Sequence, residues 1–423
     1  MLKLLFLAPF LVHAQPDVNK AASQLNFAAK GAEVAAAEPS GVSVQALNPR
    51  YWVVIAASTK EERSAIANFG MAIAEIAKTT VSGIIRESEL KKLEKKGFTV
   101  VSKMTLEEFS QKFFRDFPQE DAKYHNYKEM TDELRKIAQE NPGLASLFSI
   151  GKSAEGREIW CLRFNTSPGR AADSKPGAVF MGEHHAREHL SVEIPLLYAK
   201  WLAENKEKPE VKNVIAERDI YILPMVNPDG GEYDIKDGSY KWWRKNRRKV
   251  SGGEYGVDLN RNYDCLWGQG GSSSSPGSET YMGPKAFSEP ETQAVKKFFD
   301  ERNNIKVFIT YHTYGKDVMY PWGGSNELLP EKDLAAHKAL ARKMAEMTGY
   351  TSRQSSDMYI ATGDTADWTY DKHKIFSFTI ELEPDQYGSG GFYPGADMID
   401  QSAKGNINAA YYLTKMAANP YGE

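Results

Sequence analysis

The stretch F-M-G-E-H-H-A-R-E-H-L-S-V, residues 180–192, decides how this 423-residue chain is interpreted. An apolar run over residues 177–182 leads straight into three histidines and two glutamates, and an amphipathic segment follows. A strand that ends in such a cluster points imidazole and carboxylate side chains into the crevice beyond a sheet edge, where ligands of α/β proteins bind. These two groups together form a typical zinc-binding set. The stretch therefore predicts a metal site at the end of a strand.

Two assignments of the metal ligands compete within this stretch. In the first, His185 and Glu188 are ligands and the third ligand lies far downstream. In the second, His185 and His189 are ligands and Glu188 is the base, as in H-x-x-E-H endopeptidases. The second assignment needs a helix across the motif, but a strand leads directly into it and the next helix is expected only from residue 191. We therefore favour the first, with His184 and His189 as packing or supporting residues.

The composition is that of an ordinary globular protein, which we expect to be a monomer. Hydrophobic residues make up 41% of the chain and the formal net charge is -3, so neither nucleic acid nor a membrane is expected as a partner. The basic run K-W-W-R-K-N-R-R-K at residues 241–249 is a single patch in a net acidic chain and does not change this expectation. Cys161 is expected to be a buried free thiol, and a Cys161–Cys265 disulfide is the alternative.

The N-terminus has the composition of an export signal. Residues 1–14 combine a lysine, an apolar run and the small residues V-H-A before the expected cut. We therefore expect a secreted protein, either extracellular or periplasmic. Residues 15–50 are rich in alanine and small polar residues, which predicts a poorly ordered lead-in.

A small domain and a connector are expected next. Residues 51–104 read as β-α-β-β-α-β, the order of a ferredoxin-like α+β sandwich. They contain no histidine and no cysteine, so we interpret them as a chemically silent pro-domain. Residues 105–119 form a charged connector in which Lys112 and Arg115 are candidate cleavage sites for an activating endoprotease.

Strands and helices alternate over residues 120–423, the predicted catalytic domain. This alternation predicts an α/β fold with a mixed, mainly parallel central sheet and helices on both faces. Ser288 and Glu291 are expected to form a capping box, and the Gly/Ser-rich residues 268–277 a surface loop without chemistry. Strands are expected at residues 147–150, 158–164, 178–182, 219–225, 306–311 and 376–382, and helices at 127–140, 191–205, 288–303, 334–347 and 398–416.

His312 is the candidate for the third ligand. It ends an apolar strand, as residues 177–182 end just before the histidine cluster. Two strand ends of one sheet bring their side chains together across a crevice, which would unite His312 with His185 and Glu188. A lone histidine satisfied by its neighbours is the simpler alternative for His312 taken alone.

Two further positions carry side chains suited to catalysis or binding. Glu381 is a carboxylate inside an apolar strand, where burial is costly unless the group is paired, faces a metal or acts as a base with a raised pKa. A structural ion pair with an arginine is the alternative for Glu381. Asn260 stands beside Arg261, and an amide next to a planar guanidinium suits bidentate capture of a carboxylate.

Six short motifs follow one another along the chain: H-A-R-E at 185–188, W-R-K at 243–245, N-R-N at 260–262, H-T-Y at 312–314, Y-I-A-T-G-D-T-A-D-W at 359–368 and F-T-I-E-L at 378–382. Together and in this order they resemble the zinc carboxypeptidase family, the carboxypeptidase A-like enzymes. The resemblance runs from about residue 124 to the C-terminus, and the upstream sandwich resembles the family's activation domain. It implies a zinc metallocarboxypeptidase, made as a zymogen, that hydrolyses the C-terminal peptide bond of peptides and proteins.

The resemblance also implies a role for each matching residue. One Zn²⁺ is held by His185, Glu188 and His312, with a position open for water. Glu381 takes the proton of that water and passes it to the leaving amine, and Arg244 stabilises the oxyanion. The other substrate-binding residues form two groups: Asn260, Arg261 and Tyr359 grip the terminal carboxylate, and Arg187 and Tyr314 line the subsite before the scissile bond.

The specificity pocket is the least determined part of the resemblance. Ala366, just before an Asp-Trp pair, takes the position that tunes the pocket in the family, and it is neither branched nor acidic. Asp364 either faces the same pocket, as in broad-specificity bacterial members, or caps a turn beside Gly363. We expect broad specificity with a preference for apolar or aromatic C-termini and some cleavage after Lys or Arg. A catalytically dead, peptide-binding relative is the runner-up, although no ligand, base or clamp residue is missing.

Overall fold

The computed structural model describes residues 48–106, 108, 121, 123–167, 174–236, 240–386 and 390–422. The predicted signal segment lies outside this part of the chain, as do most of the predicted lead-in and connector, including Lys112 and Arg115. Among the helices that are described, none is both long enough and apolar enough to cross a membrane.

An antiparallel four-stranded unit contains the first described elements. Its elements are β1 (Arg50–Ala56), α2 (Lys60–Asn68), β2 (Ala72–Ile76), β3 (Thr80–Arg86), α3 (Glu87–Lys95) and β4 (Val100–Thr105). The sheet order is β2-β3-β1-β4. α2 begins with a capping box, in which Thr59 accepts a hydrogen bond from the backbone of Glu62 and Glu62 accepts one from Thr59. Val53, Ile55 and Leu93 are fully buried in its small core.

The rest of the described chain is built around an eight-stranded sheet with the order β11-β10-β12-β9-β7-β8-β6-β5. Its strands are β5 (Ala145–Lys152), β6 (Glu158–Phe164), β7 (Gly177–Met181), β8 (Asp219–Leu223), β9 (Ile305–Thr313), β10 (Asp317–Tyr320), β11 (Thr351–Gln354) and β12 (Phe376–Leu382). The pairs β12–β9, β9–β7, β7–β8 and β10–β11 are parallel, and the others are antiparallel. The predicted mixed, mainly parallel sheet is confirmed.

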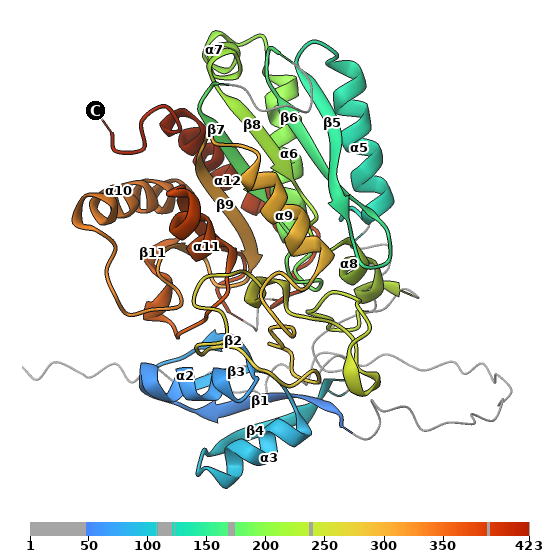
Figure 1. Ribbon diagram of the computed structural model, residues 1–423, viewed down its shortest axis with the longest axis vertical. Helices are drawn as coiled ribbons and strands as arrows, with labels where there is room; N and C mark the ends of the chain where they lie inside the picture. The colour runs from blue at the N-terminus through green and yellow to red at the C-terminus, as the bar shows by residue number, and fades with distance from the viewer. Residues whose placement is uncertain are drawn as a thin grey trace, which may run out of the picture. The chain divides into compact units, whose positions relative to one another are not determined.

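Helices cover both faces of this sheet, as predicted. α5, α6, α7, α10 and α12 share one apolar cluster with it, and α9 and α11 share the other. Figure 1 shows α9 lying across the face of the sheet that is turned toward the viewer. The helices are α5 (Tyr127–Glu140), α6 (Leu190–Glu204), α7 (Pro209–Glu217), α8 (Pro228–Asp234), α9 (Pro290–Asp300), α10 (Glu331–Thr348), α11 (Thr365–His373) and α12 (Asp397–Met416), with short 3₁₀ turns at Ser251–Gly253, Leu259–Arg261 and Ser355–Asp357.

Alternate residues of β7 face opposite sides of the sheet. Ala178 and Phe180 belong to one apolar cluster, Val179 and Met181 belong to the other, and all four are fully buried. A parallel strand covered on both faces has this near-continuous apolar sequence. β7 is buried along its length. The polar residues that follow it come after its carboxyl end and so lie at that edge of the sheet, beside β9.

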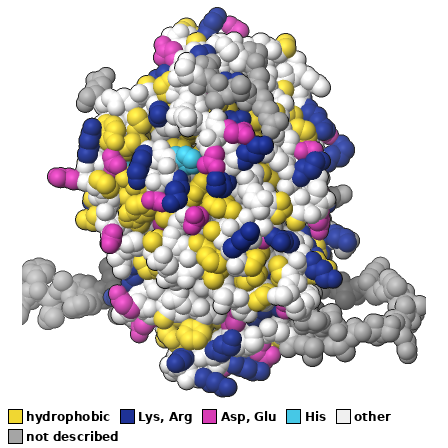
Figure 2. Space-filling model, viewed as in Figure 1, with side chains coloured by type: hydrophobic (Ala, Val, Ile, Leu, Met, Phe, Trp, Pro, Cys, Tyr) yellow, Lys and Arg dark blue, Asp and Glu magenta, His cyan; other side chains and the backbone are white. Residues whose placement is uncertain are grey.

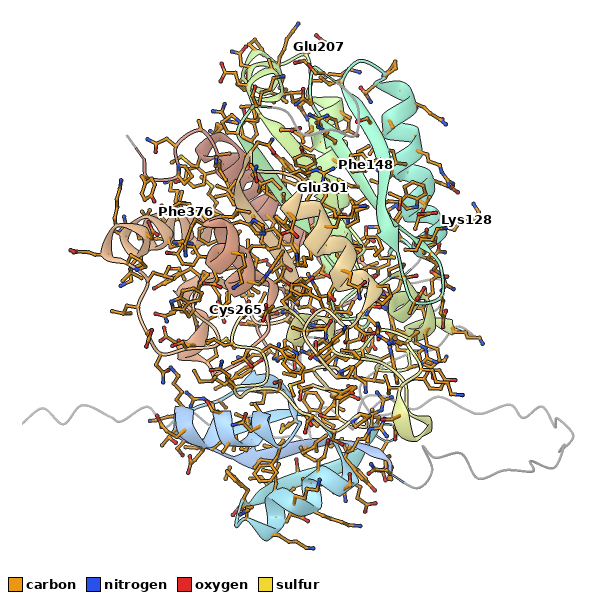
Figure 3. The ribbon with its side chains drawn as sticks, viewed as in Figure 1. Lys128, Phe148, Glu207, Cys265, Glu301 and Phe376 are labelled. Carbon is orange, nitrogen blue, oxygen red and sulfur yellow. The ribbon has the colours of Figure 1, made fainter. Side chains whose placement is uncertain are left out.

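Charged side chains of both signs are interspersed over the face of the molecule seen in Figure 2. Lys128 points away from the sheet on the outer side of α5 (Figure 3) and pairs with Asp132 one helical turn further on, at 2.5 Å. Exposed pairs of this kind contribute only about 0.3–0.5 kcal/mol each. The stability of the fold therefore comes mainly from the two buried clusters.

Both cysteines are free and buried. Cys161 lies in β6, and Cys265 (labelled in Figure 3) lies in the loop segment that precedes α9. Burial raises the pKa of the Cys161 thiol to about 12, so this thiol stays protonated and unreactive at neutral pH. The expected free thiol is confirmed, and the alternative disulfide is not formed.

Candidate active site

Three side chains from two neighbouring strand ends meet in one cluster. The ligand atoms of His185, Glu188 and His312 all lie within 4.8 Å of one another. Glu188 uses one oxygen for each imidazole: its Oε1 lies 2.8 Å from His185 Nδ1 and its Oε2 lies 2.9 Å from His312 Nδ1. All three side chains are buried. Two imidazole nitrogens and a carboxylate that face one point form a donor set for a divalent transition metal.

The loop between β7 and α6 brings His185 and Glu188 to this point. A Cβ at Gly182, the first residue of the loop, would lie 2.1 Å from the carbonyl oxygen of Ser191. Only glycine therefore lets the chain turn this closely against the start of α6. A hydrogen bond from the backbone nitrogen of Glu188 to the carbonyl oxygen of His185 tightens the turn at 3.1 Å.

His312 reaches the cluster from the adjacent strand. β9 is the parallel neighbour of β7, with Thr310 in register with Met181. His312 stands two residues beyond that pair, at the carboxyl end of β9. Carboxyl ends of neighbouring parallel strands meet at one edge of the sheet, so the sequence-based expectation for His312 agrees with the geometry.

His189 lies outside the ligand cluster. Its Nε2 lies 3.0 Å from Asp234 Oδ2 and its Nδ1 lies 3.4 Å from Glu183 Oε1. Burial lowers the pKa of His189, but the two carboxylates outweigh burial and raise it to about 10. α6 begins only after His189, so His185 and His189 do not face a common point one turn apart on a helix. The H-x-x-E-H assignment therefore does not describe this geometry.

Asp258 links the ligand cluster to Arg244. Its Oδ1 lies 3.2 Å from His185 Nε2, and its Oδ2 accepts a hydrogen bond from Arg244 Nε at 2.9 Å. Burial raises the pKa of Asp258, but Arg244 and His185 together hold it well below its usual range. Sequence reasoning assigned no role to Asp258. The contacts that give Asp258 its role join distant segments of the chain, and no local sequence pattern reports them.

Most of the predicted site residues line one cavity, in which the ligand cluster lies. Arg187, Tyr314 and Ala366 do not line it. The cavity-lining members of the predicted set are His185, Glu188, Arg244, Asn260, Arg261, His312, Tyr359, Asp364 and Glu381.

Glu381 enters the cavity from β12. The residue is half-buried, and its buried Oε2 atom has no hydrogen-bond partner among the described residues. Burial and the nearby carboxylates of Glu188 and Asp317 raise the pKa of Glu381 well above its usual range, with Arg244 opposing them. A carboxylate in this condition can take up a proton.

The guanidinium of Arg261 is held by backbone carbonyl groups. Its Nε donates to the carbonyl oxygen of Gly271 at 3.0 Å, and its Nη1 donates to that of Asn260 at 2.7 Å. A Cβ at Gly271 would lie 2.0 Å from the carbonyl oxygen of Ile360, next to Tyr359. The Gly/Ser-rich loop, expected to be a surface loop without chemistry, therefore holds the Arg261 side chain through the carbonyl oxygen of Gly271.

Asp364 both caps a helix and lines the cavity. It is the N-cap of α11, and its Oδ1 accepts a hydrogen bond from the backbone nitrogen of Asp367 at 2.9 Å. Its Oδ2 is buried without a hydrogen-bond partner among the described residues, and the residue lines the cavity. Ala366 is buried in the first turn of α11 and does not reach the cavity.

Arg187 and Tyr314 lie behind Phe392, which is itself part of the cavity wall. The Arg187 guanidinium stands over the Phe392 ring at 4.2 Å, and its Nη1 lies 3.2 Å from Glu279 Oε2. Tyr314 packs edge-to-face on the same ring, with centroids 5.0 Å apart. Both side chains are fully or almost fully buried, so they support the wall of the cavity.

Comparison with known proteins identifies the family. A sequence model described as zinc carboxypeptidase matches residues 130–409, more than half of the chain. The chain belongs to the zinc carboxypeptidase family. A zinc carboxypeptidase of Saccharothrix mutabilis subsp. capreolus is 36% identical over 305 residues, which cover 70% of each chain. Carboxypeptidase A1 of Homo sapiens is 35% identical over 292 residues, which cover 67% of each chain.

A solved structure extends this likeness over more of the chain. The crystal structure of carboxypeptidase A from Helicoverpa armigera superposes with a TM-score of 0.72 at 25% identity, and the match covers 88% of this chain and 97% of that one. As a member of the zinc carboxypeptidase family, the protein is a zinc-dependent peptidase and thus a hydrolase. The fold class expected from the sequence is confirmed by this likeness.

The donor set fits the cofactor of a zinc carboxypeptidase, which is Zn²⁺. Hydrolytic zinc sites typically use three protein ligands drawn from histidine and carboxylate and keep a further position for water. His185, Glu188 and His312 supply two imidazoles and one carboxylate in this arrangement. Asp258 lies against the outer nitrogen of one imidazole, the kind of contact that orients a zinc-binding histidine.

Proposed function

We propose that this zinc carboxypeptidase removes single residues from the C-termini of peptides and proteins, with His185, Glu188 and His312 holding one Zn²⁺. The observation that carries the proposal is the convergence of this donor set with Glu381 and Arg261 on one cavity. Bound there, Zn²⁺ acts as a Lewis acid that lowers the pKa of water and polarises the scissile carbonyl group.

Glu381 is the proposed general base and acid. Its half-buried carboxylate has one buried oxygen without a hydrogen-bond partner among the described residues, so that oxygen is available to a water molecule. Burial and neighbouring carboxylates favour its protonated form. Glu381 takes a proton as water attacks the carbonyl carbon, and then returns it to the nitrogen of the leaving amino acid.

Arg244 is the proposed stabiliser of the developing oxyanion. Its Nε donates to Asp258 Oδ2, and its Nη1 lies 3.9 Å from Glu188 Oε1. These carboxylates hold the guanidinium at the cavity wall and raise its pKa, against the effect of burial. A fixed cation in a site shielded from water stabilises negative charge as it forms on the substrate oxygen.

The proposed carboxylate clamp explains why the enzyme would act only at chain ends. Asn260, Arg261 and Tyr359 line the cavity, and a guanidinium with an adjacent amide suits a carboxylate. An internal peptide bond offers no carboxylate to this clamp. Only a C-terminal residue would then place its peptide bond between the metal site and Glu381.

We propose a broad specificity, with a preference for apolar or aromatic C-terminal residues and some acceptance of Lys and Arg. Apolar side chains such as Met319 and Ala361 line the cavity together with Asp364. The unpartnered Oδ2 of Asp364 can accept a hydrogen bond from a basic side chain. The substitution Asp364→Asn keeps the helix cap. In this variant, kcat/KM for a substrate that ends in Lys, divided by kcat/KM for one that ends in Phe, should fall roughly tenfold. An unchanged ratio would remove the argument from charge.

We also propose that the protein is a secreted zymogen whose four-stranded unit is the pro-domain. Ile73 and Ala74 of β2 line the same cavity as the ligand cluster, where they occupy space that a substrate needs. Ion pairs join the unit to the catalytic domain, such as Arg86–Glu254 at 2.9 Å. An endoprotease that cuts within residues 105–119 would release the unit, and residues 1–14 would direct export.

A panel of blocked dipeptides tests the proposed function. The purified chain is treated mildly with trypsin and assayed for release of the C-terminal amino acid, with and without a metal chelator. We expect release that the chelator abolishes and added Zn²⁺ restores, and little release before trypsin treatment. If no member of the panel shows release that the chelator abolishes, the proposal is contradicted.

A further inference from the structure

The side chain of Thr365 lies between the carboxylate clamp and the metal ligands. Thr365 is the first residue of α11 and is fully buried. Its Oγ1 donates a hydrogen bond to Asn260 Oδ1 at 2.9 Å, and its backbone nitrogen donates to the same oxygen at 3.0 Å. One residue thus supplies two donors to one atom of the Asn260 amide.

These two bonds determine which way the amide of Asn260 faces. A backbone N–H can only donate, so the amide atom opposite it must be the oxygen. The rotated amide would place its NH₂ group against the N–H of Thr365 and leave buried donors without acceptors, which is costly. The NH₂ group of Asn260 is therefore the part of the amide that can reach a molecule in the cavity that Asn260 lines.

The same hydroxyl connects the clamp to the metal ligands. The single hydrogen of the Thr365 hydroxyl points to Asn260, so Thr365 Oγ1 accepts a hydrogen bond from His184 Nε2 at 2.9 Å. The same His184 nitrogen lies 2.9 Å from the Tyr263 hydroxyl. His184 Nδ1 lies 3.2 Å from Thr310 Oγ1. That hydroxyl lies 3.2 Å from Nε2 of the ligand His312, whose Nδ1 faces Glu188. Of the two roles expected from the sequence for His184, packing or support, these contacts favour support of the site.

We propose that Thr365 is a positioning residue, which holds the Asn260 amide with its NH₂ group toward the substrate carboxylate and ties this clamp to His312 through His184 and Thr310. The inference rests on the proposed function, because it assigns Asn260 to the clamp. A clamp contact of this kind is made with the bound substrate and the transition state alike. Its loss should therefore raise KM and leave kcat nearly unchanged.

Three variants of the full chain, assayed after activation on a blocked dipeptide with a free C-terminal carboxylate, test the role of Thr365. Thr365→Val removes the hydroxyl and keeps the shape of the side chain. KM should rise roughly 5- to 10-fold, and kcat should stay within about twofold of the wild-type value. Thr365→Ser restores the hydroxyl and should restore KM. Thr369→Val removes a buried hydroxyl one turn along α11, which bonds Ser377 and the backbone carbonyl oxygens of Thr365 and Ala366 but leaves the side chains of Thr365 and Asn260 untouched. It should leave KM unchanged.

A double-mutant cycle separates positioning from a general structural effect. If Thr365 acts through Asn260, then Thr365→Val should add nothing to KM in an Asn260→Ala background. Independent, multiplicative effects would overturn the inference, as would a KM increase in Thr369→Val equal to that in Thr365→Val. An inactive wild-type chain would instead contradict the proposed function, so the two failures are distinguishable.

Discussion

Glu381 of β12 is the register partner of His312 of β9. Residues in register on adjacent parallel strands point to the same face of the sheet. The proposed base and the proposed third ligand are therefore placed relative to one another by the hydrogen bonds of the sheet, and not by a loop. A site built on strands is held more firmly than one built on loops alone, which suits a base that must receive a proton at a fixed distance from the metal.

Replacing Glu381 by glutamine removes the proton acceptor and keeps the size of the side chain. We expect kcat to fall by roughly 10²- to 10⁴-fold, the usual contribution of a general acid-base group. Zinc content and the unfolding temperature should remain close to those of the wild type, because the side chain holds neither the metal nor the fold. Steady-state kinetics with metal analysis check this result. A variant that keeps more than a tenth of the wild-type kcat would rule out Glu381 as the base.

Asp258→Asn should weaken zinc binding and catalysis together. The new amide cannot present an oxygen to both His185 and Arg244, so one of the two contacts is lost. We expect zinc affinity to fall roughly 10- to 100-fold and kcat to fall with it at saturating zinc. Asp229→Asn is the matched control, because Asp229 is buried and paired with Arg157 at 2.7 Å but lies outside the ligand cluster. Equal losses of zinc affinity in both variants would contradict the role of Asp258.

Glu89 of α3 should make the docking of the four-stranded unit depend on pH. Its carboxylate is buried without a hydrogen-bond partner among the described residues. Burial raises its pKa from 4.5 to about 7, with Arg86 and Lys245 opposing the rise and Glu279 adding to it. Because the pKa of Glu89 is raised in the docked state, docking is strongest below about pH 4.5. The free energy of docking weakens by on the order of 3 kcal/mol as the pH rises through about 7.

The affinity of the released unit, measured on chain cleaved in the connector, checks this dependence. The dissociation constant should rise between pH 5.5 and pH 8.5 in the wild type and stay nearly flat in Glu89→Gln. Glu87→Gln is the control on the same helix, because Glu87 is partly exposed and pairs with Lys91 at 3.2 Å; it should keep the wild-type slope. If the dissociation constant of Glu89→Gln rose with pH as steeply as that of the wild type, Glu89 would not be the group that makes docking depend on pH.

The sheet, His312 and Glu381 could be predicted because their signals are local. The apolar run of β7 leads into the histidine cluster, and the largely apolar strands β9 and β12 carry His312 and Glu381 near their carboxyl ends, where burial leaves few roles for such residues. The rest depends on contacts between distant segments. Asp258 acquires its role only where the loop before α9 folds against His185 and Arg244, and no spacing rule in the sequence reports that contact.

Local rules also failed where a distant partner competed. Ser288 and Glu291 match the capping-box pattern, but the N-cap of α9 is Glu289 and makes no side-chain cap bond. Glu291 is buried instead, where it accepts hydrogen bonds from Asn246 and from the backbone of Ala154. α11 was not predicted as a helix, because its nine residues are too short and too rich in aromatic and β-branched side chains for a clear helical signal.

Zinc content measured on two purified variants tests the central claim most directly. The claim is that the third ligand is His312, from the next strand, and not His189, from the same motif. Wild-type chain should contain one zinc per molecule, His312→Gln should lose it, and His189→Gln should retain it if the fold is kept, as judged by circular dichroism. Retention of zinc by folded His312→Gln, together with its loss from folded His189→Gln, would contradict the account.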